Sequence, residues 1–184
     1  MLTLQYLRES MDYDPDTGVL TWRARPVEHF STERRWRAFV GQCAGKPAGS
    51  LNFHGYLNVG LNGRMYKAHR LAFALHHGIE PEDIPAQIDH IDGDRINNRA
   101  TNLRAATNAQ NQHNAGRRSD NVSGFKGVSR QKRNSKWAAK IKVHGKKLWL
   151  GLFDTAEAAY AAYCEAAKLH HGEFAKLDQA SSHP

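Results

Sequence analysis

The alternation of apolar and polar positions in the first 44 residues predicts local elements only. Residues 1–10 are compatible with one short helix, and DPDTG predicts a turn that leads into the strand-like VLTWRARP, ended by Pro26. Residues 27–42 carry no interpretable pattern. We therefore treat residues 1–44 as an N-terminal segment whose role the sequence does not define.

From residue 45 the pattern becomes sharper. AGSLNF, GYLNVGL and RMYKAH are short segments separated by HG and NG, and NG is a strong hairpin signal, so we predict a small antiparallel sheet. AHRLAFALHHG then has apolar residues at near-helical spacing with Gly78 as a stop, which predicts a helix. IPAQIDH predicts a strand, INNRATNLR a compact loop, and TNAQNQHNA a short helix capped by Thr107 or Asn108.

A second domain is predicted after a polar, glycine-bounded stretch. GRRSDNVSG lacks apolar periodicity, so we place a linker at residues 116–123 and assign residues 45–115 to one domain and 124–178 to another, with a tail at 179–184. FKGVSR, KWAAKIKV and KKLWLGLF predict three strands, the last two joined by a turn at His144 and Gly145. TAEAAYAAYCEAAKLHHG predicts the single helix that packs on them.

Two of these strands are predicted to have one apolar and one basic face. In KWAAKIKV the odd positions from Trp137 are apolar, whereas Lys140 and Lys142 share the opposite face. In KKLWLGLF the leucines at 148, 150 and 152 alternate with Lys147 and Trp149. The alternation predicts a leucine face packed on the helix and an exposed tryptophan beside lysines.

Composition favours a soluble protein with a polyanionic partner. The 26 Lys and Arg against 18 Asp and Glu give a net charge of +8 and a pI near 9.7. The two cysteines, Cys43 and Cys164, form no CxxC pair, so neither a disulfide framework nor a cysteine-rich zinc site is indicated. Without a signal peptide or an apolar run of about 18 residues, we expect a cytoplasmic protein away from membranes.

The residues with the clearest chemistry lie in IDHIDGDRINNRATNLRAATNAQNQHN. Asp89 and His90 stand side by side at a predicted strand end, and Asn102 and Asn111 follow after a loop. Phosphodiester hydrolysis needs a base for the attacking water and a cation that stabilises charge on the phosphate and the leaving oxygen. A neutral histidine, a carboxylate and an amide oxygen can supply these parts.

This segment resembles the HNH homing endonucleases, in particular the phage and intron-encoded branch in which Asp replaces the first histidine of the motif. GYLNVGLNGRMYKAHRLAFALHHG, IDHIDGD, NNR and NLR occur in the same order, over about residues 45–115. The resemblance implies a ββα-metal core with His90 as general base and Asn102 holding the catalytic loop. Asp89 and Asn111 would be ligands of one divalent cation, Mg²⁺, for which Mn²⁺ can substitute.

Simpler interpretations exist for the neighbouring residues. An isolated Asp-His pair is often a solvated or structural pair, and NNR or NLR alone is loop chemistry. We assign Asp92 and Asp94 to a turn around Gly93, and His69 to packing or a phosphate contact. His113 would face away from Asn111 on a helix, so we do not count it as a ligand.

Residues 123–177 resemble the APETALA/ethylene-response-factor DNA-binding domain, which also accompanies phage HNH endonucleases. SGFKGVSR, KWAAKIKV, LWLGLFDTAEAAYAAYCEAA and HGEFAKL carry the likeness. It implies DNA contacts by seven residues: Lys126, Lys140, Lys142, Lys147 and Trp149, with Arg130 and Arg133 as neighbours. Ser129 and Gln131 stand where plant members usually have arginines, so plant-like base specificity is not implied. The alternative is a core tryptophan beside a solvated lysine face.

Together these patterns predict an α+β protein in which a ββα-metal nuclease core precedes a three-stranded antiparallel sheet packed on one helix. We expect a monomer without an obligate protein partner that nicks double-stranded DNA near a recognised site, in a bacterial host cell if phage-encoded. The main alternative is a DNA-binding regulator with an inactive HNH module. RNA binding ranks last, because an A-form major groove would exclude such a sheet.

Overall fold

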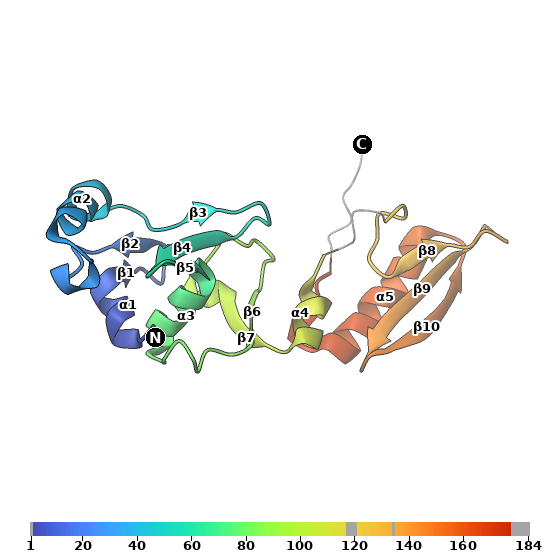
Figure 1. The fold of residues 1–184 in the computed structure, drawn as a ribbon. Helices are drawn as coiled ribbons and strands as arrows, with labels where there is room; N and C mark the ends of the chain where they lie inside the picture. The colour runs from blue at the N-terminus through green and yellow to red at the C-terminus, as the bar shows by residue number, and fades with distance from the viewer. Residues whose placement is uncertain (1, 117–120, 134, 178–184) are drawn as a thin grey trace. The chain divides into compact units, whose positions relative to one another are not determined.

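The computed structural model describes residues 2–116, 121–133 and 135–177. It divides the chain into two compact units, Met1–Ala105 and Ala106–Pro184, which Figure 1 shows as a ribbon. Part of the predicted linker, residues 117–120, and the predicted tail lie outside the described residues. The short helix predicted within the nuclease domain belongs to the second unit.

The first unit contains small sheets and short helices. In chain order they are α1 (Leu4–Ser10), β1 (Met11–Tyr13), β2 (Leu20–Trp22), the 3-10 turn η1 (Val27–His29), α2 (Glu33–Cys43), β3 (Ser50–Leu51), β4 (Leu57–Leu61), β5 (Arg64–Lys67), α3 (Ala68–His77), β6 (Gln87–His90), η2 (Ala100–Asn102) and β7 (Leu103–Ala106). Strands β3, β4 and β5 form the predicted antiparallel sheet. Helix α3 ends as predicted at Gly78, whose backbone is left-handed.

The N-terminal segment is part of the same hydrophobic core as the predicted catalytic strand. Its contribution comes from α1, β1 and β2, and the remaining core residues come from β4, α3, β6, β7 and two connecting segments, which contribute Ala48 and Ile84. The principal members are Leu7, Met11, Leu20, Val59, Leu61, Leu71, Ala72, Ile88 and Leu103. Residues 1–44 therefore pack on the nuclease-like part of the chain, a point that their sequence left open.

Helix α2 was not predicted from the sequence, and none of its residues is fully buried. It is held at one side of the unit by an aromatic cluster around Arg25, which is itself buried. The Arg25 guanidinium lies 4.8 Å from the ring centroid of Phe30 and 5.2 Å from that of Phe39. The indole of Trp36 donates a hydrogen bond of 2.9 Å to the Arg25 carbonyl. A buried arginine gives no apolar periodicity, so the pattern of the sequence concealed this contact.

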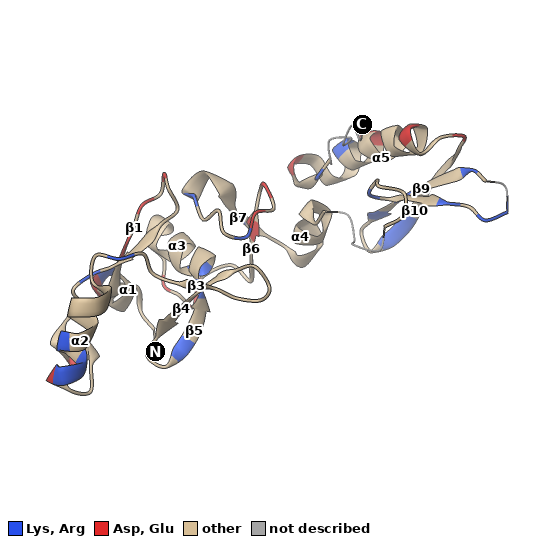
Figure 2. Cartoon of the chain, turned by 90° about the horizontal axis from the view of Figure 1, so that it is seen from above, with Lys and Arg blue, Asp and Glu red and all other residues tan. Residues whose placement is uncertain are grey.

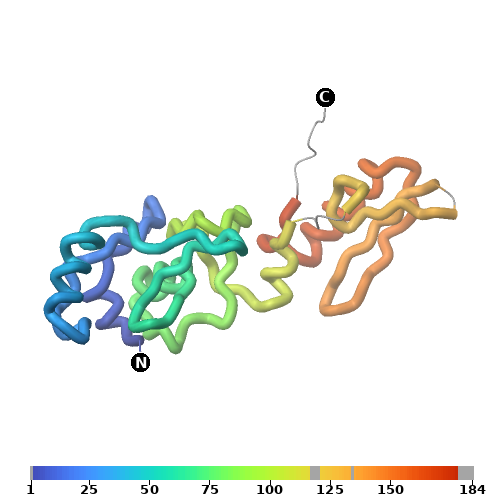
Figure 3. Tube along the Cα trace, turned by 45° about the horizontal axis from the view of Figure 1, so that its top comes forward, coloured from blue at the N-terminus to red at the C-terminus, as the bar shows by residue number. Residues whose placement is uncertain are grey.

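The second unit consists of a short helix and a sheet covered by a long helix. Its elements are α4 (Asn108–Asn114), β8 (Val128–Arg130), β9 (Trp137–Val143), β10 (Lys146–Phe153), α5 (Ala156–His171) and η3 (Gly172–Phe174). The predicted three-stranded antiparallel sheet is present and has the order β10-β9-β8, and α5 packs on one face of it (Figures 1 and 3). Ala139, Ile141, Ala159 and Tyr163 are buried between these layers.

The prediction of a continuous leucine face on β10 was wrong. The register of β10 against β9 shifts between Trp149 and Gly151, which marks a β-bulge. After such a shift the following side chains change sides. Leu152 therefore lies opposite Ala138, on the face away from α5, and is 42% exposed. Leu150 packs against the buried cluster, whereas Leu148 is exposed.

The turn between β1 and β2 provides a test of whether the N-terminal segment packs closely on residues 98 and 99. Gly18 has φ of +77°, and a Cβ there would lie 2.5 Å from the Arg99 nitrogen and 2.6 Å from the Asn98 carbonyl carbon. We expect Gly18→Ala to lower the free energy of unfolding by about 3 kcal/mol, since it combines backbone strain with overpacking. Chemical denaturation would measure this.

The matched control is Gly63→Ala, because Gly63 has φ of +71° but a Cβ there would meet open space. It reports the cost of the left-handed backbone alone, about 1 kcal/mol. Equal losses in the two variants would contradict the close packing of the turn on residues 98 and 99.

Candidate active site and nucleic-acid interface

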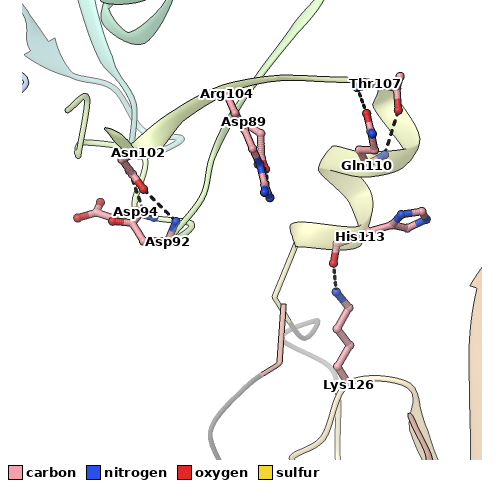
Figure 4. A network of polar contacts seen from close by, with 9 residues as sticks. All are labelled: Asp89, Asp92, Asp94, Asn102, Arg104, Thr107, Gln110, His113 and Lys126. Atoms are coloured by element: carbon pink, nitrogen blue, oxygen red, sulfur yellow. Dashed lines mark hydrogen bonds and ion pairs between the residues drawn. The ribbon is translucent and has the colours of Figure 1, made fainter. Parts of the chain in front are cut away.

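The predicted Asp-His pair lies at the end of β6, and both side chains are buried. Arg104, on the neighbouring strand β7, donates to Asp89 Oδ2 from Nε at 3.0 Å and from Nη2 at 2.9 Å (Figure 4). A buried carboxylate needs such a charge partner, because it has lost its hydration. Sequence analysis did not single out Arg104, although it is the arginine of NLR, the segment that brought Asn102 to attention.

His90 is oriented by a second residue that sequence analysis missed. Its Nε2 lies 3.2 Å from Asn98 Oδ1, in a contact with no solvent access. An amide oxygen only accepts hydrogen bonds, so Nε2 carries the proton and Nδ1 is the basic nitrogen of this tautomer. Asn98 is 2% exposed, and its carbonyl accepts a hydrogen bond of 2.8 Å from the Tyr13 hydroxyl. The position of Asn98 in the NNR segment is the signal in the sequence that could have identified it.

The surroundings of His90 favour a neutral imidazole. Burial lowers the pKa of His90, and the Asn98 hydrogen bond and three nearby aspartates offset this only in part. The ring of His69 packs edge-on against it, with 4.9 Å between ring centroids. Burial, together with the neighbouring His90, lowers the pKa of His69 to about 3. His69 is therefore a packing residue in its neutral form, one of the two roles considered for it.

Asn102 connects both ends of the loop that follows β6. Its Nδ2 donates to Asp92 Oδ1 at 2.9 Å and to the Asn97 carbonyl at 2.8 Å, while its Oδ1 accepts from the Asp92 backbone at 3.0 Å. Asp92 and Asp94 form turn contacts around Gly93, whose φ is +77°. These bonds have the geometry expected for holding the loop, and the catalytic role of Asn102 stays a prediction.

Asn111 is in a different unit from the other three site residues. It lies on α4, which begins with a capping box between Thr107 and Gln110 (Figure 4). Asp89, His90 and Asn102 are brought together within the first unit, whereas Asn111 is in the second. The relative positions of the two units are not determined, so the ββα-metal arrangement stays a prediction.

The predicted DNA-binding residues of β9 and β10 share one face of the sheet. Lys140 is directly opposite Trp149, and Lys142 is opposite Lys147. Trp149 is 50% exposed, and the Lys140 ammonium lies 5.0 Å from its ring centroid. In the described part of this unit, lysines and arginines colour the strands, whereas acidic residues gather on and around α5 (Figure 2). The sheet therefore presents a basic face with an aromatic residue in it.

The other three predicted contacts are placed differently. Arg130 pairs across the strands with Trp137, on the side of α5, with its guanidinium 5.8 Å from the indole centroid. Arg133 is exposed in the β8–β9 turn. The Lys126 ammonium is bound to the carbonyls of His113 and Ala115, each at 2.5 Å. Of the predicted set, the structure brings together the four residues on β9 and β10.

Comparison with protein families identifies both parts of the chain. The family model for HNH endonucleases matches residues 66–113, and that for the AP2 domain matches residues 123–173. The chain thus combines an HNH endonuclease domain with an AP2-type DNA-binding domain, which confirms the resemblances found in the sequence. Helix α4 lies inside the HNH match.

Similar proteins come from a phage and from plants. The chain is 35% identical over 90 residues to "Protein 3.8" of Escherichia phage T7, a match that covers 49% of this chain and 74% of the phage protein. It therefore belongs to the family of that phage protein. It is 48% identical over 56 residues to "Dehydration-responsive element-binding protein 2A" of Arabidopsis thaliana, covering 29% of this chain and 16% of the plant protein.

A third relative is "Ethylene-responsive transcription factor ERN3" of Medicago truncatula, 41% identical over 76 residues, which cover 40% of this chain and 32% of that protein. The chain thus spans a minor part of these plant proteins.

No solved structure matches. None of the helices in the described residues is long and apolar enough to cross a bilayer.

The buried histidine pair makes a prediction about pH. Unfolded His69 takes up a proton near its usual pKa of 6.5, whereas the folded pKa is about 3, so its contribution is complete above pH 6.5 and is lost as pH falls towards 3. A difference of one bound proton corresponds to about 1.4 kcal/mol per pH unit. We expect the stability advantage of wild type over His69→Gln to shrink between pH 6.5 and 5, as followed by denaturant unfolding. Parallel profiles would contradict a neutral, buried His69.

Proposed function

We propose that this protein is a metal-dependent endonuclease that nicks double-stranded DNA near a site bound by its C-terminal domain. The observation that carries the proposal is the buried pair at the end of β6, in which His90 is neutral and oriented by Asn98. A histidine with these properties can take a proton from water near neutral pH. The HNH match over the same residues supports this chemistry.

The donor atoms of the site suit a hard divalent cation. Asp89 offers a carboxylate and Asn111 an amide oxygen, and such ligands are preferred by Mg²⁺ and accepted by Mn²⁺. When bound, the cation would stabilise negative charge on the scissile phosphate and on the leaving oxygen. Arg104, on β7, donates to Asp89 Oδ2 from Nε and Nη2, and these two hydrogen bonds hold the carboxylate in a fixed orientation.

The side chains of the first unit would perform the proton transfer. His90 Nδ1 would accept a proton from the attacking water as the new P–O bond forms. The bond between phosphorus and the 3′ oxygen breaks, and the leaving 3′ oxygen takes up a proton from solvent. The Asn98 hydrogen bond keeps the imidazole in the tautomer that can accept this proton. Asn102 maintains the loop in which Asn98 lies. The products would carry 5′-phosphate and 3′-hydroxyl ends.

The C-terminal domain would supply most of the DNA affinity. Lysines on the outer face of the sheet can bind phosphates, and the exposed Trp149 can pack on sugars and bases. One active site per chain favours cutting of one strand at a time by a monomer. The relationship to a phage protein supports a role in a bacterial cell. A cytoplasmic, mobile homing enzyme is what the resemblance to the HNH homing endonucleases implies.

Cleavage of supercoiled plasmid tests the proposed activity. We expect wild type to produce the nicked form with Mg²⁺ and no product with EDTA. His90→Ala should cut at least about 100 times more slowly, because general base catalysis contributes a factor of this size. Nicked and linear products are separated on a gel at fixed salt concentration.

The control for this experiment is His170→Ala, because His170 is exposed on α5 and is not one of the candidate site residues. It should cut at the wild-type rate. If wild type binds the plasmid but does not cut it with Mg²⁺ or Mn²⁺ on DNA from several sources, the DNA-binding regulator with an inactive HNH module becomes the better description.

The basic face of the sheet makes a separate prediction about DNA affinity. Lys147→Ala should weaken duplex binding and reduce the slope of log K against log salt concentration by about 1, because one phosphate contact is lost. Fluorescence anisotropy at several salt concentrations measures both quantities. Lys168→Ala, which removes an exposed lysine of α5, is the matched control and should leave the slope unchanged. Equal slopes for all three proteins would argue against phosphate binding by this face.

A further inference from the structure

Helix α4 lies within the HNH match but is held in place by the AP2-type domain. We infer that His113, Lys126 and His171, here called the α4 clamp, position the nuclease residue Asn111. The inference rests on the proposed function, because it concerns the ligand that α4 would supply. The C-terminal domain would then support the helix that carries Asn111, in addition to its role as a DNA-binding module.

The first contact of the clamp is a stack of two imidazoles. The rings of His113, on α4, and His171, at the end of α5, are nearly parallel at 7°, with centroids 3.6 Å apart. His171 is buried, and its Nε2 donates a hydrogen bond of 2.9 Å to the Lys142 carbonyl on β9. The ring against which α4 packs is therefore anchored to the central strand of the sheet.

The second contact is at the C-terminal end of α4. The Lys126 ammonium donates to the carbonyl of His113 (Figure 4) and to that of Ala115, and the helix leaves both carbonyls without intrahelical partners. A cation at this position also interacts favourably with the helix dipole. Lys126 belongs to the segment that leads into β8, so both contacts come from the AP2-type domain.

The short length of α4 explains why these contacts matter. It has seven residues, and a helix of this size is unstable in water without tertiary contacts. Asn111 precedes His113 by two residues, and its carbonyl accepts a hydrogen bond of 3.0 Å from the Ala115 backbone. Asn114, in the last turn, is buried. Loss of the clamp would therefore disturb the turn of helix that carries Asn111.

The test uses three variants of the full chain. His113→Ala removes the stack from the α4 side and leaves the core of the C-terminal domain intact. His113→Phe keeps a flat ring that can stack on His171. His170→Ala removes an adjacent, exposed histidine and is the control. Hydrogen exchange of the α4 amides reports on the clamp directly, without any requirement for cleavage activity.

In His113→Ala we expect the α4 amides to exchange faster while those of β8–β10 stay protected. The kcat for cleavage should fall by about 10-fold or more, and half-maximal activity should require more Mg²⁺, as is usual when a support of a metal ligand is lost. The KM for DNA should stay close to the wild-type value. His113→Phe should restore most of the exchange protection and of kcat, and His170→Ala should match wild type.

Two results would overturn the inference. If α4 exchanges in His113→Ala as it does in wild type, the clamp does not hold the helix. If α4 exchanges faster but kcat and the Mg²⁺ requirement are unchanged, the clamp does not position Asn111. A wild type that binds DNA without cutting would overturn the proposed function, and the positioning role with it, whereas the exchange data would still decide whether the clamp exists.

Discussion

The hydrogen bond between His90 and Asn98 is the interaction on which the candidate active site depends. It selects the imidazole tautomer, and it survives because its surroundings exclude water that would compete for either partner. Much of the first unit maintains those surroundings. Tyr13 binds the Asn98 carbonyl, and burial raises the pKa of this tyrosine to about 12, so the donor keeps its proton. The turn at Gly18 packs against the same backbone. The N-terminal segment thus supports the loop opposite the histidine.

The sequence predicted the elements whose residues have a regular period or a strong local signal. The β4–β5 hairpin, α3 with its glycine stop and the three-stranded sheet on α5 all appear where expected. Motif order pointed to Asp89, His90 and Asn102, which the structure brings together in the first unit, and their roles stay a prediction. Asn98 and Arg104 were missed because each acts through polar side-chain contacts, which leave no periodic trace in the sequence. Helix α2 was missed for a similar reason, since the cluster that holds it is centred on a buried arginine.

The assignment of α4 to a domain differs between the sequence and the structure. By sequence, α4 completes the HNH module, and its residues match that family. By contact, it belongs with the sheet and α5. The apparent conflict is resolved if a nuclease motif too small to stabilise its last helix uses a neighbouring domain for support. Such sharing would explain why a short helix made largely of polar residues, with no apolar stripe of its own, is ordered at all.

The bulge in β10 has a consequence for how this strand can change during evolution. Odd-numbered residues face outwards before the bulge and even-numbered residues face outwards after it, because one extra residue lies between Trp149 and Gly151. Exchange of an outer residue alters only that position. Loss of Leu150, the extra residue, would instead leave Gly151, Leu152 and Phe153 opposite their present partners on β9 and on their present faces. We therefore expect β10 in related proteins to differ in length at the bulge, while the residues on either side of it keep their partners on β9.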